Sequence, residues 1–381
     1  MPTTPWVFLL NGVTDITSNI LSASITQGRE KYLDNYGGGS LSITINNNSN
    51  LANSFNFNDT IFVYNSSTTA GFRDTFAVQQ ITFNDHPGNT GLSTATIFCV
   101  DPLSRMGRYQ ATAQVLNQLI TTLQMEAFNS DPLPPDVLYV YSGFYGLGSS
   151  VASAQTYTGT VLNQLNLLQA TERGLLRTGK AFTSLTAQTV QPVSRGSIYN
   201  QLTTAFSFGR NTSSTVIAYK TFERIQNGVT FINTATISPL GLSSETRTNT
   251  ASVTTYGEAF YNSSTVDYNA TQAQGNGDWI VNTFSNTTDL RFKIGFTDRM
   301  QNSSAYTTFL ANFPGIAFSL AYRVPAAGSD TTVNVVLEGW TINITPEQTT
   351  YELSFSPLSY YQFFTLNSSV LGILNTSRLG W

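Results

Sequence analysis

The sequence predicts a mainly β protein with α+β insertions, with a β region at each end of the chain and a helical or α/β stretch between them. Three observations lead to this prediction. Apolar and polar residues alternate along both ends of the chain, which is the period of half-buried strands. A central stretch changes to helical spacing, and two similar hairpins stand near the two ends of the 381-residue chain.

Residues 1–110 are expected to form the first β-barrel domain. In Ser40–Asn47, Leu41, Ile43 and Ile45 alternate with polar residues, as in a strand with one buried face. Stretches of the same style follow, separated by turns rich in Gly, Asn and Ser. They predict five or six short antiparallel strands in a barrel or sandwich, and they cover residues 59–65, 76–83 and 93–100.

Residues 111–204 are expected to form an inserted α/β domain with two helices. Apolar residues at helical spacing predict the first helix over residues 113–128, and the prolines of residues 131–136 end it. The second helix is predicted over residues 158–174. Thr160 is its expected cap and Gly174 its expected end, with Leu162, Leu165 and Leu168 facing inward.

Residues 205–357 are expected to form the second β-barrel domain. The sequence returns to strand patterns from about Phe182 to Thr255. An insertion near residues 269–286 is ambiguous, because Gly275 and Gly277 weaken an otherwise acceptable helix. Residues 358–381 form the expected C-terminal docking segment.

Two hairpins suggest that the end domains are related. Residues 79–103 and residues 338–358 each contain an alternating strand, a turn with proline, a Thr-rich alternating strand and then Pro-Leu. Pro87 corresponds to Pro346, and Pro102 to Pro357. Convergence of simple hairpins is the alternative explanation, because such patterns are common. A true internal repeat would give one related β-domain at each end.

Composition limits the possible functions. Charged residues make up 10% of the chain and the net charge is −4, against roughly 25% charged residues in an average globular protein. So few cations disfavour a stable complex with nucleic acid, whereas a sparsely charged surface suits packing against copies of the same chain. No secretory leader is expected at the N-terminus, and no apolar run approaches the about 18 residues of a membrane span.

No constellation of residues predicts catalysis, a cofactor or a metal. His86 is the one histidine and Cys99 the one cysteine, so a standard zinc cluster cannot be assembled. Cys99 is expected to be an inert thiol in a buried strand. The glycine-rich residues 143–150 and 174–180 lack the context of a nucleotide-binding loop. Several acidic residues could in principle pair in a hydrolase, but none lies in a recognisable motif; they are Asp34, Asp101, Asp267 and Asp278.

Two aromatic clusters leave a binding function open. Aromatic faces stack on sugars as well as on protein partners, so an adhesin that recognises host glycans is an alternative, although packing in a core or subunit interface is favoured. The clusters are Tyr139, Tyr141, Phe144 and Tyr145, and Tyr360, Tyr361, Phe363 and Phe364.

Both ends of the chain resemble minor tail proteins of phages and prophages. Residues 15–47 are similar to the opening of that family, whose pattern places D-I-T, I-L-S, S-I-T and G-R before L-D. Further similarity covers residues 95–108, 161–176, 338–357 and 370–381. Relatives usually carry an acidic turn after the central helix, where this chain has basic residues. The positions of the opening that match are Asp15, Ile16, Thr17, Ile20, Leu21, Ser22, Ser24, Ile25, Thr26, Gly28, Arg29, Leu33 and Asp34.

The resemblance implies a baseplate-hub, or tail-tip, protein of a phage. The resemblance also implies two related small, tube-like β-barrel domains, at residues 1–110 and 205–357, with an inserted helical or α/β domain at 111–204. Such a protein would form a homotrimer in which six barrels match the sixfold tail tube, and it would not be an enzyme. The expected partners are distal tail or tube proteins, the tape-measure protein and fibre or tip proteins. Contact with phage DNA would be transient, without stable membrane insertion. The expected location is the virion, at the tail tip.

The C-terminal segment supplies the candidate interface residues. Arg and Trp are enriched at protein interfaces, and the segment combines them with apolar residues, so docking on a neighbouring surface is favoured over an intramolecular clasp. The candidates are Tyr360, Tyr361, Leu371, Leu374, Arg378 and Trp381.

Overall fold

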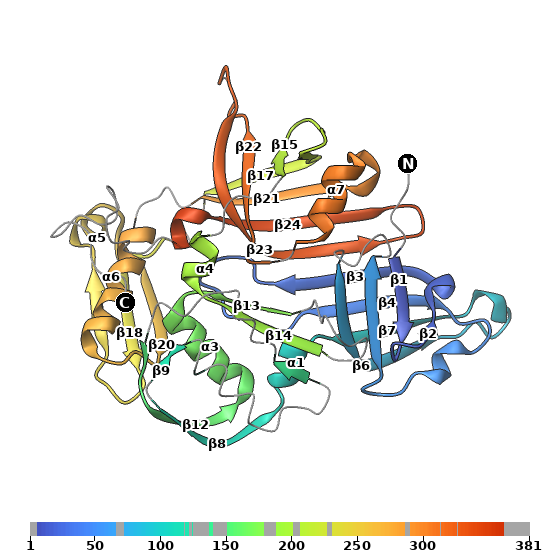
Figure 1. The fold of residues 1–381 in the computed structure, drawn as a ribbon, viewed down its shortest axis with the longest axis horizontal. Helices are drawn as coiled ribbons and strands as arrows, with labels where there is room; N and C mark the ends of the chain where they lie inside the picture. The colour runs from blue at the N-terminus through green and yellow to red at the C-terminus, as the bar shows by residue number, and fades with distance from the viewer. Residues whose placement is uncertain are drawn as a thin grey trace.

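Strands dominate the described part of the computed structural model of the chain, which confirms the mainly β class. Figure 1 shows the N-terminal strands in blue and the C-terminal strands in orange and red as neighbouring parts of one body. The structure describes residues 6–65, 72–117, 119–121, 124, 137–139, 151–178, 188–200, 206–226, 231–285, 290–312, 314–325 and 327–361.

The N-terminal part contains the strands expected from the alternating pattern, and all its strand pairs are antiparallel. A short 3-10 helix, Leu51–Ser54, lies between the third and fourth long strands. The four stretches predicted as strands are confirmed. The strands are β1 (Trp6–Leu10), β2 (Thr14–Asp15), β3 (Ile20–Gly28), β4 (Ser40–Asn46), β5 (Thr60–Asn65), β6 (Arg73–Asn84) and β7 (Thr94–Val100).

The C-terminal part forms a second set of strands. A helix, α7 (Ser303–Leu310), lies between β21 and β22 and packs Phe309 into the core. Asn302 caps this helix by accepting a hydrogen bond from the Ser304 amide. The strands are β15 (Ser207–Gly209), β16 (Val216–Ala218), β17 (Thr221–Gln226), β21 (Leu290–Thr297), β22 (Ala317–Tyr322), β23 (Thr331–Ile344) and β24 (Thr349–Pro357).

The two parts share one strand order. The N-terminal order is β3-β4-β7-β6-β5-β1, and the C-terminal order is β17-β21-β24-β23-β22-β15. Strands at the same place in the two orders also follow each other in the same sequence along the chain. Thus β1 corresponds to β15, β3 to β17, β4 to β21, β5 to β22, β6 to β23 and β7 to β24. One pair differs, because β1 runs antiparallel to β5 while β15 runs parallel to β22.

The two hairpins compared in the sequence carry a bulge at the same place. In β6 the register shifts between Val78 and Gln80, and in β23 between Leu337 and Gly339. Gln79 and Glu338 are therefore the extra residues of the two bulges. Their separation along the chain equals that of Pro87 and Pro346. This common landmark aligns the two parts residue by residue.

Strand β23 joins the two parts into one sheet. Its residues 339–344 pair with residues 23–28 of β3, and 14 strands become continuous. One apolar core lies behind both parts. Trp6 adds a link, because its indole nitrogen donates a hydrogen bond of 3.0 Å to Thr349 in β24. No closed barrel is found among the described strands, so the two barrels and the domain boundaries stay predictions.

The segment between β7 and β15 confirms one predicted helix and corrects the other. Helix α3 (Val161–Glu172) begins after Thr160, whose hydroxyl accepts a hydrogen bond from the Asn163 amide. The predicted helix over residues 113–128 is wrong in its first half. Residues 110–116 form β8 and pair with β12 instead, since cross-strand pairing overrides helical spacing. Most of its second half lies outside the described residues.

The end of α3 also differs from the prediction. Arg173, not Gly174, takes the left-handed conformation there, with φ 59°. Gly174 is required for a different reason, because a Cβ would lie 2.0 Å from the Val193 carbonyl oxygen. The remaining elements are α1 (Pro102–Met106), β8 (Gln110–Leu116), β9 (Leu119–Ile120), β10 (Val137–Tyr139), β11 (Val151–Ala152), β12 (Gln155–Thr160), β13 (Leu175–Thr178), β14 (Gln188–Val193) and α4 (Arg195–Asn200).

A second insertion separates β17 from β21. The ambiguous stretch of the sequence is a helix, α6, which begins after the cap Asn269. Gly277 allows this helix to lie close to β19, because a Cβ would meet the Arg247 side chain at 2.8 Å. The elements are β18 (Thr234–Pro239), β19 (Glu245–Thr248), α5 (Thr250–Tyr256), β20 (Phe260–Thr265) and α6 (Ala270–Phe284).

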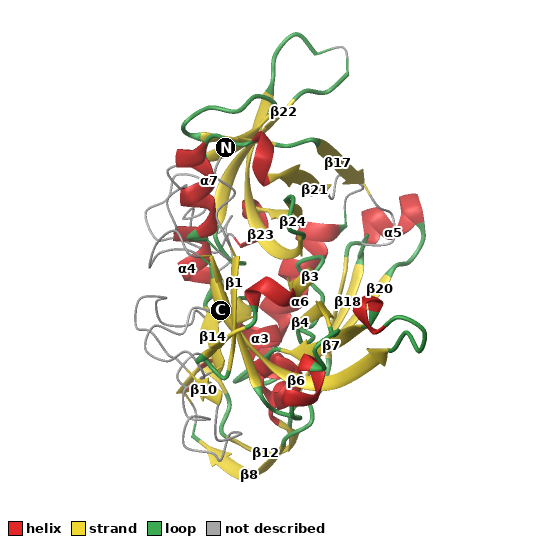
Figure 2. Cartoon of the chain, turned by 90° about the vertical axis from the view of Figure 1, so that its right-hand side faces the viewer, coloured by secondary structure: helices red, strands yellow, loops and turns green. Residues whose placement is uncertain are grey.

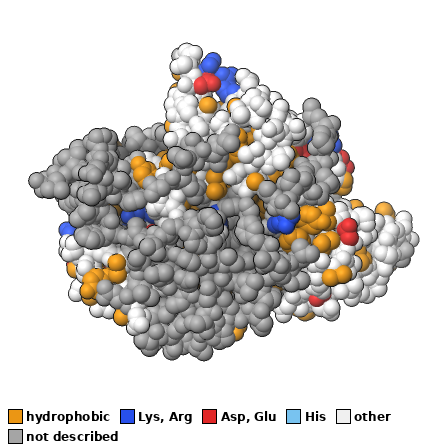
Figure 3. Space-filling model, in the orientation of Figure 1, with side chains coloured by type: hydrophobic (Ala, Val, Ile, Leu, Met, Phe, Trp, Pro, Cys, Tyr) orange, Lys and Arg blue, Asp and Glu red, His pale blue; other side chains and the backbone are white. Residues whose placement is uncertain are grey.

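A second apolar core lies between the two insertions and contains Leu165, Leu168 and Ile280. The side view in Figure 2 shows helices α3 and α6 beside the strands of the main sheet. None of the described helices is long and apolar enough to cross a membrane. On the face drawn in Figure 3, charged side chains form only a few small groups on the described surface, in keeping with the composition.

Candidate functional site

The outward face of the main sheet is a ladder of small hydroxyl side chains. Thr341 of β23 lies opposite Thr26 of β3, with their hydroxyl oxygens 3.4 Å apart. Asn343 accepts a hydrogen bond of 2.7 Å from Ser24. The alternation of the strands produces this face, because every second residue points away from the core. The ladder runs on through β4 and β7 with Ser40, Ser42, Thr44 and Thr96.

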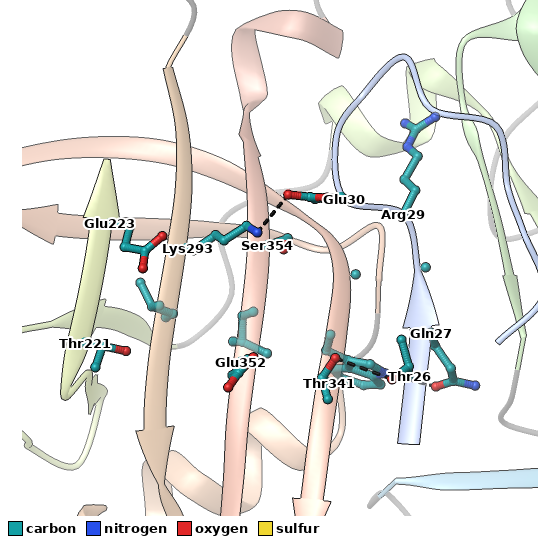
Figure 4. Close-up of a pocket in the computed structure, with 15 residues that line it drawn as sticks. Thr26, Gln27, Arg29, Glu30, Thr221, Glu223, Lys293, Thr341, Glu352 and Ser354 are labelled. Atoms are coloured by element: carbon teal, nitrogen blue, oxygen red, sulfur yellow. Dashed lines mark hydrogen bonds and ion pairs between the residues drawn. The ribbon is translucent and has the colours of Figure 1, made fainter. Parts of the chain in front are cut away.

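A groove of about 630 Å³ crosses this face from β17 to β3. Glu30 and Lys293 form an ion pair of 2.7 Å at one end (Figure 4). Hydrogen bonding to Lys293 lowers the pKa of Glu30. Glu223 and Glu352 add negative charge to the lining. Both signs of charge and several hydroxyls are thus available to a polar partner.

Beside the groove, a buried ion pair closes the junction of the two parts. Arg29 donates from Nε to Glu338 at 2.7 Å, and both side chains are nearly inaccessible. The guanidinium lies over the rings of Tyr32 and Tyr36, at 5.0 and 4.7 Å from their centroids. Burial lowers the pKa of Arg29, but Glu338 and the tyrosine oxygens outweigh this effect, so the pKa lies well above its usual value. The junction therefore keeps a fully charged arginine.

Glycine makes the junction possible. Gly28 has φ +85°, and a Cβ there would lie 2.2 Å from the Glu338 carbonyl oxygen. A Cβ on Gly339 would lie 2.7 Å from the Arg29 carbonyl oxygen. The two strands approach so closely because both residues lack a side chain. This close approach places the bulge residue Glu338 beside Arg29.

A pair of buried carboxyls lies on the N-terminal side of the junction. Asp74 and Asp101 are 2% and 1% exposed. Burial raises the pKa of Asp74 to about 8 and that of Asp101 to about 7. Gln27 donates to Asp74 and accepts a hydrogen bond of 3.0 Å from the Trp340 indole. This network connects β3, β6 and β23.

The structure places two of the candidate interface residues inside the chain. Tyr360 and Tyr361 belong to the 3-10 helix Leu358–Tyr361 and are 8% and 0% exposed. The Tyr361 hydroxyl donates to Glu338 at 2.7 Å and accepts from Arg29 at 3.1 Å. Tyr360 packs edge-on against Phe284. The contacts that the structure gives these tyrosines are therefore intramolecular.

The other candidates stay predictions. Leu371, Leu374, Arg378 and Trp381 lie outside the described residues. In the aromatic cluster of the glycan hypothesis, Tyr141, Phe144 and Tyr145 also lie outside them, as do Phe363 and Phe364. The burial of Tyr360 and Tyr361 leaves neither ring exposed as a face on which a sugar could stack.

Of the residues screened for chemistry, Asp101 and Asp267 are buried carboxyls, and burial raises the pKa of both; the others have ordinary surroundings. Cys99 is buried, as expected, and burial raises the pKa of its thiol. His86 is exposed in its turn. Asp34 lies near Lys31, and Asp278 lies 3.7 Å from Arg247. In the part of the chain that the structure describes, no group of three or more His, Cys, Asp or Glu residues could hold a metal ion.

Sequence reasoning missed the junction residues. Arg29 was noted only within the opening motif, and Asp74 and Glu338 were not singled out. One signal could have revealed Glu338, because it stands in the first hairpin strand at the position of Gln79. An acid among apolar strand residues, where the related strand has a neutral amide, indicates a buried partner.

Comparison with solved structures shows the fold. The chain resembles a tail protein from Neisseria meningitidis MC58, with a TM-score of 0.61 and 10% identity over 93% of this chain and 96% of the other. It also resembles a 43 kDa tail protein of prophage MuSo2 from Shewanella oneidensis, with a TM-score of 0.58 and 10% identity over 94% and 98% of the two chains.

A third structure extends the likeness to secretion systems. The E. coli c3393 protein, a component of the type VI secretion system described as similar to the T4 phage tail proteins gp27 and gp5, matches with a TM-score of 0.50 and 9% identity, over 89% of this chain and 73% of the other. No family model and no curated protein matches the sequence. The chain thus has a fold found in tail proteins, as the opening motif indicated, and also in a type VI component.

Proposed function

We propose that this chain is a structural protein of a phage tail tip, the trimeric hub at the end of the tail tube. The observation that carries the proposal is the fold, which matches two phage tail proteins over nearly the full length of each chain. In this proposal the hub ends the tube, adapts its sixfold symmetry to a threefold tip and anchors the proteins that contact the host during DNA ejection.

The repeated strand order supports the symmetry part of the proposal. Each chain contributes two sets of six strands with the same order. Three chains then supply six similar units, which is the number needed to face a sixfold tube. The two β-barrels at residues 1–110 and 205–357, with the inserted domain at 111–204, are part of this proposal.

The hydroxyl ladder supports a passive role toward DNA. Strong binding to phosphates needs Lys and Arg, and the ladder offers Thr26, Ser40, Ser42 and Thr341 instead. DNA therefore makes only transient contact with the hub. The hub is not an enzyme, and it resides in the virion without stable insertion into a membrane.

Other tail proteins are the proposed partners. They are the distal tail or tube proteins, the tape-measure protein and the fibre or tip proteins. Residues 358–381 serve as the docking segment, with Leu371, Leu374, Arg378 and Trp381 as its contact residues. The described part of this segment, through Tyr361, is hydrogen-bonded to Glu338 at the junction.

Light scattering of the purified chain, followed by electron cryo-microscopy of assembled tails, tests the proposal. The expected result is three copies per particle in solution and a threefold ring at the end of the tube. A monomer that decorates the outside of the tail would contradict the proposal.

The adhesin alternative gains no support from the described residues. It relied partly on Tyr360 and Tyr361 as exposed rings, and both are buried. Loss of phage adsorption on changing either residue, with assembly and fold intact, would revive it.

A further inference from the structure

Two strand edges of the chain are left without a strand partner in the described structure. Strand β17 pairs with β21 along one edge, and no described strand pairs with its other edge. Residues 80–84 of β6 pair with β7 along one edge, and again no described strand covers the other. Figures 1 and 2 show β17 and β6 in different parts of the molecule, so one chain does not join them.

These edges correspond to the two edges that meet at the junction within the chain. By strand order, β17 corresponds to β3 and β6 corresponds to β23. Strand β3 pairs with β23 through residues 339–344. The chain therefore contains one copy of a contact and the two separate halves of a second copy.

Exposure of side chains marks the same edges as incomplete. Ile342 of β23 is covered by β3 and is 1% exposed, whereas Phe83, its equivalent in β6, is 43% exposed. Ile25 of β3 is fully buried, whereas Arg224, its equivalent in β17, is exposed. An open strand edge presents unpaired backbone N–H and C=O groups, which are a template for pairing with another chain, and an exposed apolar ring on it favours that association.

We infer that β6 of one copy pairs with β17 of a second copy, antiparallel, in the register of the β3–β23 junction. This inference rests on the proposed hub function and names the surface that joins its subunits. The equivalent bulge residues Gln79 and Glu338 align β6 with β23. Cys99 pairs with Leu41, and its equivalent Phe355 pairs with Phe292, so Leu41 corresponds to Phe292. This correspondence aligns β3 with β17. The register places Phe83 opposite Arg224, Thr82 opposite Ile225 and Asn84 opposite Glu223.

The chemistry of these pairs fits the register. Phe83 and Arg224 share the core side of the sheet, where a guanidinium can stack on a ring. On the outer side, the amide of Asn84 can donate to the carboxylate of Glu223. Asn84 corresponds to Asn343, which already bonds across the junction to Ser24 at 2.7 Å. The second copy of the contact thus repeats an asparagine of the first.

The geometry also explains how the assembly closes. The contact joins different surfaces of two copies, head to tail, and such contacts form a ring when the rotation between copies closes. The sheet then continues from each subunit into the next. The intrachain junction keeps its ion pair between Arg29 and Glu338, whereas the contact between copies has Gln79 at the bulge position.

Disulfide trapping tests the register directly. In the variant Asn84→Cys with Glu223→Cys, directly opposed residues lie about 5 Å apart between Cβ atoms, so mild oxidation should link copies into dimers and trimers. The matched control, Ser24→Cys with Asn343→Cys, should link within one chain and give no ladder. The unaltered chain is the control for any link formed by Cys99, which is buried.

The outcomes separate this inference from the hub function itself. Trimers by light scattering together with an intermolecular ladder support both. Trimers without a ladder, while the control link forms, overturn the strand pairing and leave the hub proposal standing. Monomers without a ladder overturn both.

A second test introduces charges at the proposed pair of Asn84 and Glu223. Both side chains are exposed, so the changes should preserve the fold. Asn84→Asp places like charges opposite each other and should weaken association by about twofold to fivefold per contact. Adding Glu223→Lys to the same chain should restore association. Equal association of the unaltered chain, the single variant and the double variant, measured by sedimentation, would overturn the assigned register.

Discussion

Ile342 and Phe83 occupy equivalent positions in two sheets of the same strand order, and they are 1% and 43% exposed. Glu338 and Gln79 are likewise equivalent, yet Glu338 is fully buried and paired with Arg29, while Gln79 is partly exposed beside Arg108. The C-terminal sheet has its strand edge covered within the chain, and the N-terminal sheet does not. The difference teaches that one topology can serve a permanent junction in one half and leave an open edge in the other.

The largest expected effect comes from breaking the ion pair at the covered edge. Glu338→Ala should lower the free energy of unfolding by about 3–5 kcal/mol, because it leaves the Arg29 guanidinium buried without a counter-charge. The matched change Gln79→Ala should stay within about 0.5 kcal/mol, since Gln79 is partly exposed. Urea unfolding of both variants measures the contrast. Equal losses would contradict the assignment of the junction to one bulge.

The apolar pair at the two edges should show a smaller contrast. Ile342→Ala should cost about 2–5 kcal/mol, because it opens a cavity under β3. Phe83→Ala should cost less than about 1 kcal/mol in the isolated subunit, since the ring is already in contact with solvent. Thermal and urea unfolding at a concentration where the chain is monomeric checks this. A large loss for Phe83→Ala there would show that its edge is covered within the chain.

The buried carboxyls of the N-terminal strands should make the stability of the chain sensitive to pH. Asp74 and Asp101 have pKa values of about 8 and about 7 in the folded chain, above the value of about 3.9 expected when unfolded. Their contribution to stability is therefore complete below about pH 4 and is lost as the pH rises through 7 to 8. The loss amounts to at most about 1.4 kcal/mol per pH unit for one carboxyl.

Urea unfolding between pH 5 and pH 8.5 measures this dependence. Asp74→Asn should flatten it, because asparagine cannot ionise. At the equivalent positions the C-terminal strands have Val333 and Pro357, which carry no charge. The strand register thus aligns Pro357 with Asp101, one residue from the match with Pro102 expected from the sequence. A slope that is unchanged in the Asp74→Asn chain would contradict the role of this carboxyl.

Local pattern predicted what depends on neighbours along the chain. The alternation of Leu41, Ile43 and Ile45 predicted β4, and Thr160 with the leucines after it predicted α3, because a strand face and a helix cap are local properties. The opening motif, including Gly28 and Arg29, also pointed to the tail-protein fold that the comparisons show.

Tertiary structure decided the rest, because its causes are partners far apart in sequence. Residues 113–116 have helical spacing but become a strand, since β12 offers them a ladder of hydrogen bonds. Gly275 and Gly277 indicated a weakened helix, yet the helix forms. Gly277 is there because packing against β19 requires a small residue at this position. The meeting of Arg29 with Glu338 spans 309 positions. The sequence thus determined which strands and faces exist, and long-range packing decided which edges are closed and which stay open for another copy.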